Sequence, residues 1–110
     1  MGERPSIEKH LSCPAEFTAD LIGGRWKIVL LWYLLQGVHR FSDLQRAVPG
    51  ITQKVLTHQL REMERSGLLT RTVYAEVPPK VEYQLTPVGL TLKPVVDAMH
   101  QWGAEHAARR

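Results

Sequence analysis

One stretch of the sequence, residues 52–65, combines cations, an imidazole, a hydroxyl and an amide at helical spacing. At about 100° per residue, one side of such a helix is expected to be buried and holds Thr52, Leu56, Leu60 and Met63. The opposite side is polar and holds Lys54, Thr57, His58 and Arg61, with Gln53 at its edge. Base edges in the major groove accept hydrogen bonds from Lys and Arg and exchange them with Gln, so this face predicts contact with DNA. The alternative is an ordinary solvated helix face.

Cys13 is the single cysteine, so the chain cannot form an internal disulfide. It directly precedes Pro14, and proline is favoured in the first turn of a helix. A thiol at a helix start feels the positive end of the helix dipole, which favours the reactive thiolate. The available products are an alkylated thiol, a mixed disulfide with a small thiol, or a bridge between two copies of Cys13. The alternative is a thiol that simply packs beside an apolar contact.

The other reactive side chains do not assemble into an evident site. His10 and Cys13 have an H-x-x-C spacing, but two ligands are too few for a structural metal. The remaining histidines, at positions 39, 58, 100 and 106, form no convincing ligand pair. Gly23-Gly24 ends an expected helix instead of following a strand, so it does not predict a phosphate-binding loop. We therefore expect no cofactor, no metal and no enzymatic activity.

The elements that must position these residues follow from apolar spacing and helix caps. Helices are expected over 14–22 and 25–35, the second of them apolar on almost every side and therefore buried. Ser42 and Gln45 have the spacing of a capping box, which predicts a short helix that stops at Pro49-Gly50. Thr52 is then a suitable cap for the helix that carries the polar face and ends near Ser66.

The remainder of the chain changes to a β pattern and then returns to a helix. Residues 69–74 and 81–85 are rich in Val, Tyr and Thr, and Pro78-Pro79-Lys80 between them predicts a hairpin with a projecting, basic tip. Thr86-Pro87 starts the last helix, and Pro94 either kinks that helix or restarts it. The order of four helices, a hairpin and a final helix predicts a mainly α fold with a small β-hairpin, the winged helix-turn-helix.

Length and charge agree with a single DNA-binding domain. The chain has 110 residues and a formal net charge of +3, with 44% hydrophobic and 23% charged residues. From Arg40 to Lys80 there are seven basic and four acidic residues, so the central segment carries the whole excess. The longest apolar run, residues 28–35, is far shorter than the roughly 20 residues of a membrane span. The first ten residues lack the apolar core of a secretion signal, so we expect a cytoplasmic protein with no membrane partner.

Several motifs together resemble those of the HxlR-type regulators, in the same order and over about residues 11–105. This leaves residues 1–10 and 106–110 as tails of one domain, 1–110. The matching motifs are Cys13-Pro14, residues 21–27 (LIGGRWK), 40–44 (RFSDL), 50–57 (GITQKVLT), 60–64 (LREME) and 78–89 (PPKVEYQLTPVG).

The resemblance implies a bacterial transcriptional regulator that binds an inverted-repeat DNA operator as a homodimer. Dimers of this family pair through the first and last helices. This would assign to the interface, or to the core beside it, Phe17, Leu21, Leu92, Val95, Met99 and Trp102. The alternative is a last helix that covers only its own core. Some members sense oxidants or electrophiles through a cysteine at the position of Cys13.

The resulting hypothesis is a sequence-specific regulator whose 52–65 helix reads bases, with an oxidant or a small molecule as its inducer. Ser42, Arg71 and Lys80 are expected to contact the DNA backbone or the minor groove. For the hairpin residues, the alternative is a charged strand edge that discourages aggregation. One alternative function is a winged-helix module that holds an acidic protein partner. Another is a DNA-binding regulator that senses a small ligand between the helices of the dimer.

Overall fold

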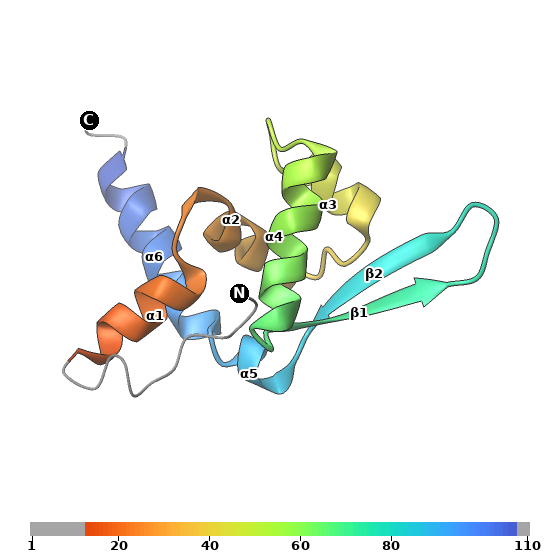
Figure 1. Cartoon of the computed structure of the whole chain (residues 1–110). Coiled ribbons are helices and arrows are strands. Elements are labelled where there is room, and N and C mark those ends of the chain that lie inside the picture. Colours follow the sequence, from red (N-terminus) through yellow and green to blue (C-terminus); the bar gives the residue numbers. More distant parts are fainter. Residues whose placement is uncertain (1–12, 108–110) are drawn as a thin grey trace.

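The computed structural model of the chain describes residues 13–107, and its elements follow the order of a winged helix-turn-helix (Figure 1). Two helices come first and pack beside the helix-turn-helix pair; the hairpin wing and two further helices follow. The elements are α1 (Pro14–Ile22), α2 (Arg25–Leu35), α3 (Phe41–Ala47), α4 (Gln53–Arg65), β1 (Leu69–Tyr74), β2 (Lys80–Leu85), α5 (Pro87–Leu90) and α6 (Lys93–His106).

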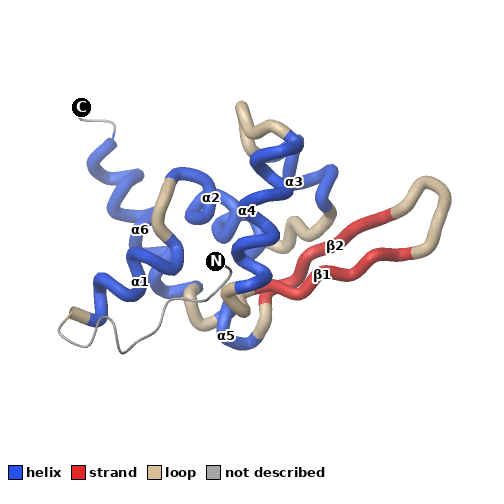
Figure 2. The backbone as a smooth tube through the Cα atoms, in the orientation of Figure 1, coloured by secondary structure: helices blue, strands red, loops and turns tan. Residues whose placement is uncertain are grey.

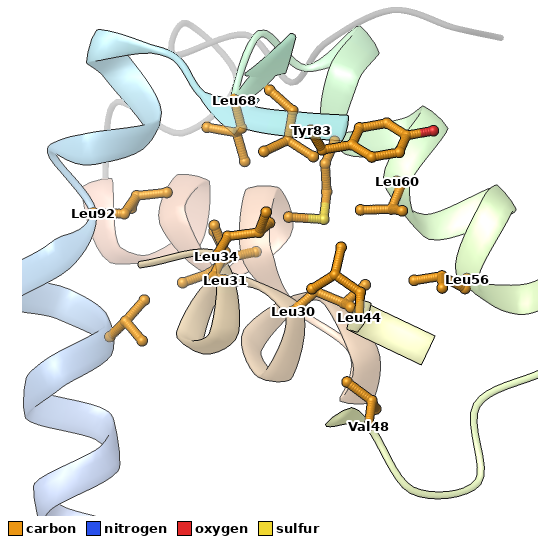
Figure 3. Close-up of a cluster of buried hydrophobic side chains, with 14 of the residues drawn as sticks. Leu30, Leu31, Leu34, Leu44, Val48, Leu56, Leu60, Leu68, Tyr83 and Leu92 are labelled. Carbon is orange, nitrogen blue, oxygen red and sulfur yellow. The ribbon is translucent and has the colours of Figure 1, made fainter. Parts of the chain in front are cut away.

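Helix α2 lies at the centre of the fold, as its apolar sequence predicts. Its Leu30, Leu31 and Leu34 are buried, and the helix contacts α3, α4, α6 and β2. Figure 3 shows these leucines meeting side chains from the other elements in one cluster. Burying a leucine side chain contributes about 1.5–3 kcal/mol, so α2 supplies much of the free energy that holds the helix-turn-helix together.

Helix α4 has the cap and the buried stripe that its sequence predicts, with one exception. The Thr52 hydroxyl accepts a hydrogen bond from the backbone N–H of Val55 at 3.1 Å, and Leu56, Leu60 and Met63 are fully buried. The prediction that Thr52 shares this buried stripe is wrong, because the residue precedes the helix and its side chain caps the exposed N-terminal turn. The cap and the stripe together fix which side of α4 faces solvent.

The start of α3 differs from the predicted capping box. The helix begins at Phe41, its N-cap is Arg40, and no side chain caps it, so Ser42 lies inside the first turn. The reason is a contact between this part of the chain and the distant strand β2. His39 and Arg40 run alongside β2. The Tyr83 N–H donates to the His39 carbonyl at 2.9 Å, and the backbone of Arg40 pairs with that of Glu82 as in an antiparallel sheet. The extended backbone therefore continues to residue 40, and the helix starts directly after it.

The wing is an antiparallel pair of strands that projects well beyond the helices (Figure 2). Its register runs from Leu69 opposite Leu85 at the base to Tyr74 opposite Lys80 near the tip. Only the base is anchored in the core, where Tyr83 is 2% exposed, while every β1 residue after Leu69 is exposed. The outer half of the wing is thus free to meet a ligand.

The C-terminal segment forms two helices, which confirms the alternative in which Pro94 restarts the helix. The Thr86 hydroxyl accepts from the Gly89 N–H at 3.0 Å to cap α5, and α6 then begins at Lys93 with Pro94 in its first turn. Across residues 13–107, every helix is too short or too polar to cross a membrane.

Candidate nucleic-acid interface

The exposed side of α4 carries the polar residues that the helical spacing predicts. Lys54, His58 and Arg61 are exposed, as is Gln53 at the start of the helix, and Thr57 is half-buried. In the part of the chain that the structure describes, Lys54 and Arg61 form no ion pair, and the Glu62 carboxylate contacts Lys27 and His58 instead. Two free cations therefore stand on a helix face that the packing of Leu56 and Leu60 directs away from the core.

Helix α3 and the wing approach each other beside α4. Ser42 is exposed at the start of α3 and lines a shallow cavity of about 150 Å³ together with Lys80 and Pro79 at the start of β2. Two segments that are far apart in sequence therefore present their polar groups at one place. Arg46 of α3 is already paired with Asp43 one turn before it.

The tip of the wing is not the free basic point that the sequence predicts. The Lys80 ammonium lies 3.7 Å from a Glu76 carboxylate oxygen, 3.9 Å from one of Glu82, and 4.5 Å from the centre of the Tyr74 ring. These neighbours offset its charge. Arg71, by contrast, is exposed and has no ion pair among residues 13–107, so it is the cation that the wing offers freely.

Glu62 of α4 contacts both Lys27 of α2 and His58 of α4, and the sequence analysis did not predict these contacts. The Lys27 ammonium lies 2.9 Å from one Glu62 carboxylate oxygen, and the other oxygen lies 3.4 Å from His58 Nε2. Lys27 holds the pKa of Glu62 below its ordinary value; burial opposes this shift, and the charges of His58 and Arg65 add to it. No spacing rule could identify the pair, because only the packing of α2 against α4 brings Lys27 and Glu62 together.

The predicted interface residues divide between the core and the surface. Leu92 is buried in the core at the start of α6, while Phe17 and Leu21 of α1 are half-buried. On α6, the exposed fractions are 36% for Val95, 48% for Met99 and 62% for Trp102. These three residues follow i, i+4, i+7 spacing and form one apolar face. In Figure 1, α6 and the wing tip lie at opposite ends of the molecule.

Cys13 is exposed and caps α1 through its backbone alone. His10, the other half of the H-x-x-C spacing, lies outside the described residues. Within residues 13–107, no cluster of three potential metal ligands occurs. Three histidines have structural contacts instead: His39 Nδ1 lies 3.0 Å from the Tyr83 carbonyl, His100 stacks on Trp32, and His106 stacks on Trp102.

The sequence matches known regulators over almost its whole length. The model of the HxlR-like helix-turn-helix family matches residues 21–110. The HTH-type transcriptional regulator YdeP of Bacillus subtilis is 52% identical over 109 residues, which is 99% of this chain and 85% of YdeP. The HTH-type transcriptional regulator YybR of the same organism is 53% identical over 104 residues, or 94% of this chain and 83% of YybR.

Solved structures agree with the fold. The redox regulator HypR in its reduced form superposes with a TM-score of 0.80 at 50% identity, over 86% of this chain and 93% of that one. Its oxidized form gives 0.79 at 51% identity, over 86% and 97%. The reduced form of the transcriptional regulator YodB from B. subtilis gives 0.71 at 35% identity, over 86% and 93%.

Proposed function

The chain belongs to the HxlR-like helix-turn-helix family of transcriptional regulators, which are not enzymes, and we propose that it binds an inverted-repeat DNA operator as a homodimer. The observation that carries this proposal is the exposed face of α4. Lys54 and Arg61 are exposed there without an ion pair in the described chain, beside Gln53, Thr57 and His58. A recognition helix needs such a face to meet the acceptor-rich edges of the major groove.

The remaining polar groups would hold α4 in register with the DNA. Arg71, which is exposed on β1 opposite Tyr83, would contact a phosphate or the minor groove, and Ser42 at the start of α3 would donate to a phosphate. Lys80 can add a contact to the DNA backbone near the wing tip, although Glu76 and Glu82 share its charge. Contacts of this kind position a protein on DNA without reading its sequence.

A second copy of the chain would cover the apolar face of α6. Val95, Met99 and Trp102 form an exposed apolar stripe, and monomers seldom leave large stripes of this kind in water. Phe17 and Leu21 of α1 would extend the contact, with Leu92 supporting it from the core. A two-fold axis at α6 would direct two α4 helices toward two half-sites, which matches an inverted repeat.

Cys13 is the proposed point of regulation by oxidants or electrophiles. It is exposed, and two similar solved structures are the reduced and oxidized forms of a redox regulator. An oxidant such as diamide would take two electrons and two protons from the thiols of two Cys13 residues, which then form one disulfide between subunits. Alternatively, an electrophile would alkylate the single thiolate.

A mobility-shift titration tests DNA binding directly. The full chain would be titrated against the duplex upstream of its own gene and against duplexes selected from a random pool, each at two salt concentrations. We expect binding to one sequence class that weakens steeply and log-linearly with salt, because phosphate contacts release counterions. Failure to enrich any sequence would contradict the proposal and favour the alternative of an acidic protein partner.

The same titration with diamide tests the cysteine. We expect oxidation to change operator affinity in the native protein and to leave the Cys13→Ser variant unaffected, with a disulfide-linked dimer on a non-reducing gel. A Cys13→Ser variant that still responds to an inducer would favour the alternative of a small ligand between the dimer helices.

A further inference from the structure

Glu62 joins a lysine behind the recognition helix to a histidine on its exposed side. Its Oε1 lies 2.9 Å from Lys27 Nζ, and its Oε2 lies 3.4 Å from His58 Nε2. The exposed fraction of the side chain rises along this line, from 16% for Lys27 to 38% for Glu62 and 61% for His58. A nearly buried cation thus anchors the carboxylate, and the carboxylate reaches the imidazole at the surface that faces DNA.

The lysine keeps the acid on α4 compatible with a polyanionic ligand. A free carboxylate on this helix would repel phosphates, but the Lys27 ammonium offsets its charge and holds one of its oxygens. The Lys27 contact also keeps the pKa of Glu62 below its ordinary value, so the group stays ionised at neutral pH. Its second oxygen is therefore a fixed negative neighbour for His58.

The orientation of the ring decides what His58 offers to DNA. Nε2 faces the carboxylate, so Nδ1 is the nitrogen left to meet a ligand. In the neutral ring with its proton on Nε2, Nδ1 is an acceptor; in the imidazolium, Nδ1 becomes a donor and the ring gains a positive charge. Many of the polar groups that DNA presents to a protein are acceptors, among them phosphate oxygens and the O6 and N7 atoms of guanine.

We propose that Glu62 is a positioning residue for His58 and that His58 takes up one proton when the protein binds DNA, donating from Nδ1 to an acceptor on the operator. The inference rests on the DNA-binding function proposed above. It makes operator affinity depend on pH through one named side chain. Lys27 acts through Glu62 and is not itself expected to touch DNA.

The charges around His58 support proton uptake on binding. On α4, the charged groups near it include Lys54 one turn before, Arg61 and Arg65 after it, and Glu62, whose Oε2 lies 3.4 Å from Nε2. Helix α2 contributes Lys27, which contacts the other carboxylate oxygen of Glu62. Phosphates would add negative charge on the open side of the ring and shift the balance toward the imidazolium.

The test measures operator affinity against pH at constant salt. The full chain, His58→Gln and Glu62→Gln would be titrated with a selected duplex and with an unrelated duplex between pH 6 and pH 8. For the native chain we expect affinity to rise as pH falls, by at most about tenfold per pH unit because one proton is taken up. His58→Gln should lose this dependence, and Glu62→Gln should weaken it, because the ring is no longer held by the carboxylate. His106→Gln, altered in the last turn of α6, is the matched control and should keep it.

The two duplexes identify the acceptor. If the pH effect is confined to the selected duplex, His58 donates to a base edge; if it is equal on both, His58 donates to a phosphate, and either result supports the proposal. A flat profile for the native chain, or a pH effect that persists in His58→Gln, overturns it while leaving DNA binding intact. Absence of binding to any duplex at every pH overturns the proposed function as well.

A measurement without DNA checks the positioning role separately. In the free chain at one pH, the NMR signals of the His58 ring nitrogens should differ between Glu62→Gln and the native chain, because the amide no longer presents a carboxylate oxygen to Nε2. Unchanged signals, in a variant whose circular dichroism spectrum is native, would overturn the role of Glu62.

Discussion

The imidazole of His100 on α6 stacks on the indole of Trp32 on α2, with ring centroids 3.7 Å apart and planes 5° from parallel. Helix α2 is the central element of the DNA-binding body, and α6 carries the exposed apolar face proposed for pairing. This flat contact therefore joins the helix that would form the dimer to the helix that supports α4. Val96 of α6 is buried in the core and adds to the attachment of this helix.

Removing the imidazole should loosen α6. We expect His100→Ala to lower the free energy of unfolding by about 0.5–1.5 kcal/mol, the range measured for stacked aromatic pairs. Urea denaturation at one protein concentration measures it. His106→Ala is the control, because His106 stacks on Trp102 within α6 itself and joins no second element. Equal losses in the two variants would contradict the special role of the Trp32 contact.

Two glycines in the C-terminal helices should respond to alanine in opposite directions. A Cβ at Gly89 would lie 2.4 Å from the backbone oxygen of Leu68, so Gly89→Ala should destabilise the fold by at least about 1–3 kcal/mol. A Cβ at Gly103, inside α6, meets nothing within 4 Å, so Gly103→Ala should stabilise by about 0.5–1 kcal/mol. Thermal unfolding of both variants beside the native chain measures this, and a stabilising Gly89→Ala would refute the close contact.

The Lys27–Glu62 pair should make stability fall in acid. The pKa of Glu62 is lowered in the folded state, so the pair stabilises the fold above the carboxyl's ordinary value and this contribution is lost as pH falls through the lowered one. The free energy of unfolding should therefore decrease less between about pH 5 and pH 3 in Glu62→Gln than in the native chain. Lys27→Met should also flatten this part of the profile, and a slope identical to that of the native chain would contradict the assignment.

Two arginines should affect DNA binding in different ways. Arg61→Ala should weaken binding to the operator by about 1–3 kcal/mol and reduce discrimination between sequences, as expected for a base contact. Arg71→Ala should weaken binding to all duplexes about equally. It should also lower the slope of log affinity against log salt concentration by about one, as expected for a phosphate contact. Lys93→Ala, on α6 and paired with Asp97, is the control and should change neither property. Unchanged operator affinity would remove either arginine from the interface.

A charge on the apolar face of α6 should separate the proposed dimer. Met99 is 48% exposed on that face, and Met99→Glu would place a carboxylate between two copies, which is costly when unpaired. Light scattering coupled to gel filtration should show a monomer. Leu90→Glu is the matched control, because Leu90 is 55% exposed but belongs to α5. A dimer that persists in Met99→Glu and dissociates in Leu90→Glu would move the interface to α5.

Local signals were sufficient for most of the fold and for the face of α4. The Thr52 cap, the Leu56–Leu60–Met63 stripe and the proline at position 94 act within a few residues of themselves, so they can be recognised without knowing the neighbours. The predicted capping box at Ser42 was wrong because pairing with β2 keeps the backbone extended through Arg40, so α3 begins at Phe41, before Ser42. The prediction of a free basic wing tip was wrong because alternate residues of β2 share a face, which places Glu82 beside Lys80, and because the hairpin loop brings Glu76 to the same ammonium.

The element order, the family and the set of polar residues on α4 could therefore be predicted from the amino-acid sequence. These depend on periodicity and short motifs, which are properties of neighbouring residues. Which polar groups are free and which are paired depends on the three-dimensional arrangement of the chain. Arg61 and Arg71 remain unpaired in the described chain, while Lys80 is shared between carboxylates and Glu62 is anchored by Lys27. Coulomb interactions depend on distance in space, which the conformation of the hairpin sets for Lys80 and the packing of α2 against α4 sets for Glu62.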